Sequence, residues 1–465
     1  MKLIKGAIVG CPSPGFRLES PLIQPNKVPE WEPGSEPEKL CVDDMLDVYC
    51  GEFGPWQLRH FVLTSLAWAL EAFHTMVMIF ADQEPAWRCV KGSGSLCDKK
   101  VASVCGLEPG SWEWQGGSES STVAQWGLVC GEKYKVGLVQ ALFFAGCMIG
   151  AGVFGRLSDV DLGRKGFSTG GVGLCSFVLA TEPVGPTKRR AAGMTTFCFF
   201  PTGIASLAGI AYVFLHGVLF MSPPPSPPSF FSSSSFRSFP SPRNALDDEV
   251  NDASNDNCSK EESGPVVDVI RSPITRFRLF VAVTINFTCS GVYYGLSLNV
   301  VNLETNLHLS VLLNAVAEML AFIITAVLLD RFGRKPLAVG SQWISAIFCL
   351  TGCVVGNVGI WKVIKLCCGV LGIFGMAATY NLLFIYTAEI FPTVVRNTAL
   401  GSATQAAQMG AILAPLVVVL GRVLPFLVFG LCGLFGGLLA FYLPETLNKP
   451  LYDPMGEGEA DWRIT

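Results

Sequence analysis

Half of the 465 residues are hydrophobic, 15% are charged, and the formal net charge is −4. A chain this apolar is not an ordinary globular protein, and the composition predicts an integral membrane protein. The small net charge, with lysines and arginines grouped near the ends of apolar runs, gives no support for nucleic-acid binding.

The first half of the chain is predicted to be a short helical bundle behind a disordered, proline-rich cytoplasmic tail at residues 1–50. Residues 51–220 hold three apolar runs that can each cross about 30 Å of hydrocarbon. These runs are Trp56–Phe80, Tyr134–Phe154 and Gly193–Leu215.

A polar loop at residues 81–133 separates the first two runs and carries four cysteines: Cys89, Cys97, Cys105 and Cys130. Four cysteines allow two disulfides in three possible connectivities if the loop faces an oxidising compartment. Free thiols are the alternative.

The middle of the chain, residues 221–270, is predicted to be a linker. Its first part, MSPPPSPPSFFSSSSFRSFPSPR at Met221–Arg243, is almost entirely serine, proline and phenylalanine, and no helix tolerates this proline density. Such a composition is also expected from a translated pyrimidine-rich intron. An acidic stretch then leads into the second half.

Residues 271–447 are predicted to form a complete six-helix bundle, followed by a cytoplasmic tail at 448–465. The six predicted spans are Phe277–Val301, Leu309–Leu329, Ala338–Gly359, Val363–Tyr386, Thr398–Leu420 and Val423–Leu443.

Two charged signals occur once in each half, which indicates an internal duplication typical of transporters. The pairs are Asp159 and Arg164 with Asp330 and Arg334, and Glu182 and Arg189 with Glu389 and Arg396. Asp330 and Glu389 are 59 positions apart, whereas Asp159 and Glu182 are 23 apart, so the first half is 36 residues shorter between its signals. That difference is nearly two spans.

One further span is missing from the first half, because the serine and proline tract stands where its last span belongs. Phe167–Ala180, between the two signals, has 14 residues and is too short to span, so we expect it to re-enter or to pack irregularly. The predicted fold is therefore an all-α polytopic membrane protein of about nine to ten spans, with two halves of which the first is incomplete.

The motifs GRLSDVDLGRK and DRFGRK resemble the signature loops of the major facilitator superfamily. AEIFPTVVRNTALG and LPETLNKPL resemble its organic cation/carnitine transporters, and the stretch Cys41–Cys89 is similar to the plant members. The resemblance implies two six-helix halves, alternating access around a central cavity, and a small organic cation or zwitterion such as carnitine as the substrate, with proton coupling left open. The alternatives are a non-transporting truncated variant, a faulty gene model of such a transporter, and a sugar transporter of the same superfamily.

Two acidic residues within the spans are the first candidates for substrate binding. Glu71 lies about 16 Å from the end of its span at Asp82, and Glu318 lies about 18 Å from the end of its span at Asp330. Both are therefore near mid-depth, where an ionisable group is costly unless it faces a cavity or a partner. The alternative is that each acid has a purely structural polar partner.

Three further candidates depend on the resemblance. Tyr293 and Asn381 match positions that line the family cavity, and Gln408 stands where cation-selective relatives carry aspartate and anion- or carnitine-selective ones carry arginine. Tyrosine faces can hold quaternary ammonium groups, although packing is an equally good role for Tyr293. His74 is predicted to be a core histidine.

The duplicated loop residues are predicted to be gating residues that pair at the cytoplasmic face and hold the halves in one access state. They are Asp159, Arg164, Glu182, Arg189, Asp330, Arg334, Glu389 and Arg396. The basic members also fix topology. We expect no catalytic residues, metal or cofactor, a location in the plasma or vacuolar membrane, and no particular oligomeric state.

Overall fold

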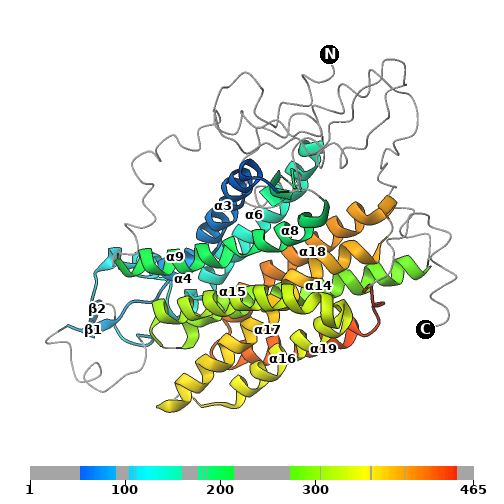
Figure 1. Cartoon of the computed structure of the whole chain (residues 1–465). Helices are drawn as coiled ribbons and strands as arrows, with labels where there is room; N and C mark the ends of the chain where they lie inside the picture. Colours follow the sequence, from blue (N-terminus) through cyan, green and yellow to red (C-terminus); the bar gives the residue numbers. More distant parts are fainter. Residues whose placement is uncertain are drawn as a thin grey trace, which may run out of the picture.

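The computed structural model describes residues 53–90, 104–159, 176–213 and 273–447, except for 109, 178, 182, 185, 304, 357, 358 and 392. The predicted tails 1–50 and 448–465, the linker 221–270 and most of Phe167–Ala180 lie outside these residues. The described residues are mostly helical. In Figure 1 the helices of the first half, coloured blue to green, lie against the yellow-green to orange helices of the second half.

The first half contains helices at all three predicted spans. They are α3 (Pro55–Met76) with its short continuation α4 (Met78–Ala81), α6 (Tyr134–Asp159), α8 (Pro186–Phe197) and α9 (Phe199–Val213). Proline opens α3, where its fixed φ favours the first helical turn. The third predicted span is interrupted at Cys198, between α8 and α9.

The loop between α4 and α6 is partly ordered into small elements that the sequence did not predict. Strands β1 (Trp87–Cys89) and β2 (Trp112–Trp114) pair antiparallel, and a short helix, α5 (Thr122–Trp126), follows. A disulfide joins Cys105 to Cys130, and Cys89 is also disulfide-bonded. Cys97 lies outside the described residues.

The second half contains helices at all six predicted spans. They are α14 (Pro273–Asn299), α15 (Leu307–Phe332), α16 (Arg334–Val354), α17 (Ile360–Ile390), α18 (Thr393–Val418) and α19 (Leu424–Ala440). We call the end of the bundle near Gly333, where α15 meets α16, the clamp end. The opposite end, which holds β1, β2 and the turn between α16 and α17, is the loop end (Figure 1).

Six helical segments of the described residues are long and apolar enough to cross a membrane: Pro55–Ala81, Ala191–Val213, Thr275–Leu303, Leu307–Leu329, Arg334–Val354 and Ile360–Ile390. The predicted spans at α6, α18 and α19 are also helical but are not among these six. For α19 the reason is its length of 17 residues. For α18 it is composition, since Gln405 and Gln408 make that helix less apolar.

The first half contacts the second half chiefly through α6 and α9, with a smaller contact between α8 and α15. α6 packs against α18, and α9 packs against α15, while α3 packs against α9. One continuous apolar core includes Met76 of α3, Phe144 of α6 and Leu207 of α9 together with residues of every helix from α14 to α19. The short first half therefore keeps a packed junction with the second half.

Gly203 allows α9 to approach α3 closely. A Cβ at this position would lie 2.8 Å from the Cα of Ala69 and 2.9 Å from the Cβ of Ala72, so a side chain does not fit there. We expect Gly203→Val to destabilise the protein by about 1–3 kcal/mol through overpacking. The measurement is thermal unfolding of the purified protein in detergent.

Gly209 provides the matched control on the same helix, because nothing lies within 4 Å of a Cβ added there. Gly209→Val should leave the melting temperature almost unchanged. Equal effects of the two substitutions would contradict the close packing of α9 on α3.

Candidate functional site

A buried acid and a buried tyrosine form the centre of the site. Glu318 of α15 is 1% exposed and Tyr293 of α14 is 2% exposed. The Tyr293 hydroxyl donates a hydrogen bond to Oε1 of Glu318. Among the described residues, Glu318 forms no ion pair with a basic side chain. Its charge is therefore offset by a single phenol hydrogen bond.

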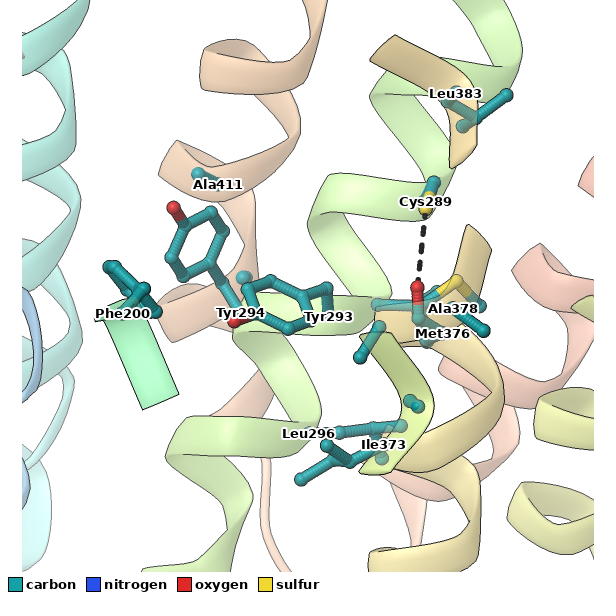
Figure 2. Packing of buried hydrophobic residues seen from close by; sticks show 14 of the residues in the cluster. Phe200, Cys289, Tyr293, Tyr294, Leu296, Ile373, Met376, Ala378, Leu383 and Ala411 are labelled. Carbon is teal, nitrogen blue, oxygen red and sulfur yellow. Dashed lines mark hydrogen bonds between the residues drawn. The ribbon is translucent and has the colours of Figure 1, made fainter. Parts of the chain in front are cut away.

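Tyr293 belongs to a group of three tyrosines, which we call the tyrosine cluster: Tyr293 and Tyr294 of α14 and Tyr380 of α17. The Tyr293 and Tyr380 rings stack with centroids 4.9 Å apart, and Tyr294 meets Tyr293 edge to face at 5.1 Å. Figure 2 shows Tyr293 and Tyr294 one helical turn from Cys289, whose thiol donates to the Met376 carbonyl at 3.9 Å. This contact fixes α14 against α17 beside the cluster.

The first half reaches the same cluster with Phe144 and Glu71. The Phe144 ring of α6 lies 4.9 Å from the Tyr294 ring. The Glu71 carboxylate of α3 lies near Tyr294 and Tyr380, and Glu318 lies near Tyr380 as well as Tyr293. Two carboxylates from opposite halves therefore lie beside one group of aromatic rings.

Glu71 has an unsatisfied oxygen. Its Oε2 atom is buried and has no hydrogen-bond partner among the described residues. A buried carboxylate oxygen without a partner is costly, and a cation or a proton would remove that cost. Aromatic rings beside it attract cations through their faces. The arrangement is chemically suited to an organic cation.

Two of the five predicted binding residues lie outside this network of contacts. Asn381 is fully buried next to Tyr380 in sequence, and both its amide oxygen and its amide nitrogen lack partners among the described residues. Gln408 is half-buried on α18 and makes no side-chain hydrogen bond among those residues.

His74 is exposed on the surface of α3, so the prediction of a core histidine is wrong.

Three members of the site were missed by reasoning from sequence: Tyr294, Tyr380 and Phe144. The adjacent tyrosines at 293 and 294 and the tyrosine before Asn381 were visible signals. Because aromatic residues are frequent in spans, only the packing of α6, α14 and α17 distinguishes these three from others.

At the clamp end, Arg334 and Glu389 form a two-pronged ion pair. Nε of Arg334 lies 2.9 Å from Oε2 of Glu389, and Nη2 lies 3.0 Å from Oε1. Arg334 is 5% exposed, so this pair is largely shielded from solvent. The Thr446 hydroxyl also donates to Oε2 of Glu389, at 2.7 Å. α16, α17 and the C-terminal segment are thereby held together.

Glu445 completes this clamp and was not among the predicted site residues, although it lies in the LPETL motif. Its carboxylate accepts hydrogen bonds from the backbone N–H groups of Arg334, at 2.9 Å, and Lys335, at 3.0 Å. These N–H groups open α16, where an acidic group is favourable. Gly333, with φ +85°, adopts the backbone conformation that brings the helix start to Glu445.

The other predicted gating residues are placed only in part. Nε and Nη2 of Arg396 are buried and have no partner among the described residues, so Glu389 pairs with Arg334 and not with Arg396. Arg164 and Glu182 lie outside the described residues, as do the side chains of Asp159, Arg189 and Asp330.

Comparison with known proteins places these features in a family. The family model described as sugar (and other) transporter matches residues 245–454. Organic cation/carnitine transporter 4 of Arabidopsis thaliana is 56% identical over 514 aligned positions, which cover 96% of this chain and 96% of the relative. Organic cation/carnitine transporter 2 of the same plant is 29% identical and covers 91% and 94%.

The chain belongs to the organic cation/carnitine transporter family. It is therefore an integral membrane transporter of the major facilitator superfamily for small molecules, and not an enzyme. The structure of the xylose transporter XylE from E. coli in a partially occluded inward-open conformation aligns with a TM-score of 0.57 at 14% identity, covering 86% of this chain and 100% of that chain. This likeness supports the fold alone.

The alignment with the Arabidopsis organic cation/carnitine transporter 4 also bears on the shortened first half. Its 514 positions outnumber the aligned residues, which are 96% of the 465 residues of this chain, so the relative contains residues that this chain lacks.

Asp82, just outside the first span of this chain, connects α4 to the loop that precedes α6. Its carboxylate accepts hydrogen bonds from the Thr122 hydroxyl and from Nε2 of Gln140, the latter at 3.3 Å. Burial raises the pKa of Asp82, and the two hydrogen bonds lower it by a smaller amount.

We expect this raised pKa to make the loop end less stable as pH rises. The folded state binds the Asp82 proton more tightly than the unfolded chain, so stability falls from about pH 3.9, the ordinary aspartate pKa, up to the raised folded pKa. The melting temperature of Asp82→Asn should therefore rise relative to the wild type across this interval. A difference that stays constant with pH would contradict the assignment.

Proposed function

We propose that this chain moves small organic cations or zwitterions such as carnitine across a membrane by alternating access. The substrate would bind at the tyrosine cluster, between Glu71 and Glu318, with Asn381 and Gln408 as further lining residues. The observation that carries the proposal is the buried Glu318 carboxylate, which lacks a basic partner among the described residues and is hydrogen-bonded to Tyr293 at the junction of the halves.

The acids and aromatic rings at the cluster favour a cation with an apolar body. Stacked tyrosine rings offer faces to a quaternary ammonium group, an attraction of roughly 0.5–2 kcal/mol. The two acids would supply the opposite charge. A carboxyl group that is protonated when empty and ionised when it holds a cation would couple transport to protons.

Alternating access requires interfaces that can separate at one end and close at the other. The contacts of α6 with α18 and of α9 with α15 are the surfaces on which the halves would move. The clamp of Arg334, Glu389 and Glu445 would keep the second half rigid at its end of the bundle. We propose that its breaking and forming accompany the change of access.

A second candidate, a non-transporting truncated variant, is favoured by one observation. The 26 residues between α6 and α8 leave no room for the two further spans that the duplication predicts. A cavity open to lipid at that place would lose substrate and protons. A faulty gene model remains a further explanation of the same shortening, and sequencing of the messenger RNA would decide it.

The test is uptake of labelled tetraethylammonium, carnitine and xylose into cells in which the tagged protein is located by microscopy and counted by immunoblot. We expect uptake of one of the first two and none of the sugar. Uptake of xylose alone would support the sugar-transporter alternative. Absence of all uptake from protein present in the plasma or vacuolar membrane would support the non-transporting variant.

A further inference from the structure

Three basic residues gather at the loop end of the second half, far from the tyrosine cluster and the clamp. Lys362 and Lys365 lie in the first two turns of α17, and Arg422 lies between α18 and α19. The Lys365 ammonium lies over the ring of Phe426, four residues after Arg422, so the start of α17 and the loop before α19 are close together. We call Lys362, Lys365 and Arg422 the basic cluster.

Lys365 is held in place inside the bundle. It is 3% exposed, and its Nζ lies 5.4 Å from the centre of the Phe426 ring in the first turn of α19. Phe426 in turn packs against Gly352 of α16, at 3.1 Å from a Cβ position there. Of the other two members of the basic cluster, Lys362 is half-buried and Arg422 is exposed.

Neither helix that starts here carries an acidic residue in its first turn. This holds for α17 and for α19. Helix N-termini have a partial positive charge, so they add to the positive potential of the three side chains. An anion at this place would be attracted by charges from two separate segments of the chain.

The surroundings of the basic cluster are apolar and exposed. Ile360 is 72% exposed and Trp361 is 52% exposed, both beside Lys362, and Leu420 is 60% exposed beside Arg422. Tryptophan next to lysine at the end of a span is typical of the headgroup level of a bilayer. A ligand with an anionic head and an apolar body matches this combination better than a free ion does.

We propose that the basic cluster binds the phosphate group of an anionic membrane lipid at the loop end of the bundle. Lys362 and Arg422 contact the phosphate, and Lys365 supports it with a fixed charge from beneath. The acyl chains lie along the exposed apolar side chains of Ile360 and Leu420. The bound lipid joins the start of α17 to the loop before α19.

The test adds phosphatidylglycerol, phosphatidylcholine or inorganic phosphate to the purified full-length protein. Two quantities are measured: the shift in melting temperature, and the retention of lipid in native mass spectrometry. We expect phosphatidylglycerol to be retained and to raise the melting temperature, and the other two to do neither. Replacing Lys362 and Arg422 together with glutamine should weaken retention roughly thirtyfold, at about fivefold per charge.

Two variants serve as controls. Lys188→Gln removes an exposed lysine of α8 and should retain the lipid like the wild type. The double variant Lys362→Arg with Arg422→Lys keeps both charges and should also retain the lipid. It distinguishes the loss of charge from a general effect of substitution on folding. An equal response to inorganic phosphate would overturn a lipid as the occupant. Equal retention of phosphatidylcholine, or an equal loss in Lys188→Gln, would overturn the site.

Discussion

Glu318→Gln is expected to lower kcat/KM for an organic cation by roughly 10- to 100-fold. Glutamine keeps an acceptor for the Tyr293 hydroxyl but removes the negative charge that would attract the substrate. Interactions with a charged group contribute about 1.5–3 kcal/mol, and each 1.4 kcal/mol corresponds to tenfold. The measurement is the initial rate of uptake across a range of substrate concentrations, at matched protein levels in the membrane.

Tyr293→Phe is the matched control for Glu318→Gln. It removes the hydrogen bond to Glu318 and keeps both the carboxylate and the ring that stacks on Tyr380. Its loss should be smaller, about tenfold or less. Uptake by Glu318→Gln at the wild-type rate, with Tyr293→Phe equally active, would exclude Glu318 from the binding site.

Arg334→Ala is expected to destabilise the protein by about 3 kcal/mol. The substitution leaves the Glu389 carboxylate, whose side chain is only 23% exposed, without its cation. Breaking a buried ion pair by removing one partner typically costs about 3–5 kcal/mol, and the partial exposure of Glu389 places this case at the low end. Thermal unfolding of the purified protein measures the loss.

Two further variants give this prediction its contrast. Arg331→Ala removes an exposed arginine at the end of α15 and should change stability by about 0.5 kcal/mol or less. Arg334→Lys keeps the charge but cannot form both hydrogen bonds to Glu389, so its loss should be intermediate. If Arg331→Ala were as damaging as Arg334→Ala, the effect would not be due to the clamp.

Much of the fold was predictable because the bilayer restricts what a span can be. A run of about 20 apolar residues must be helical in hydrocarbon, so helices lie at all nine predicted spans, the third of them as the two helices α8 and α9. The observed helix ends differ from the predicted ones where polar contacts determine them. α16, for example, begins at Arg334 because Glu445 accepts hydrogen bonds from its first N–H groups. The strands β1 and β2 were missed, since three-residue strands give almost no periodic signal.

Only the charged residues of the site were predictable from the sequence. Glu71 and Glu318 were conspicuous as acids within spans, and the structure places both at one tyrosine cluster. Tyr294, Tyr380 and Glu445 act through contacts between segments distant in sequence, which spacing along the chain does not reveal. The same reason explains why the spacing did not show the partner of Glu389, since Arg334 is contributed by the start of another helix.

The most direct test of the account is uptake by the purified chain reconstituted into liposomes, without other proteins. We predict that vesicles with the wild-type chain take up labelled tetraethylammonium or carnitine faster than vesicles with Glu318→Gln or with no protein. Equal uptake by all three preparations would show that this chain, with its shortened first half, does not transport these substrates.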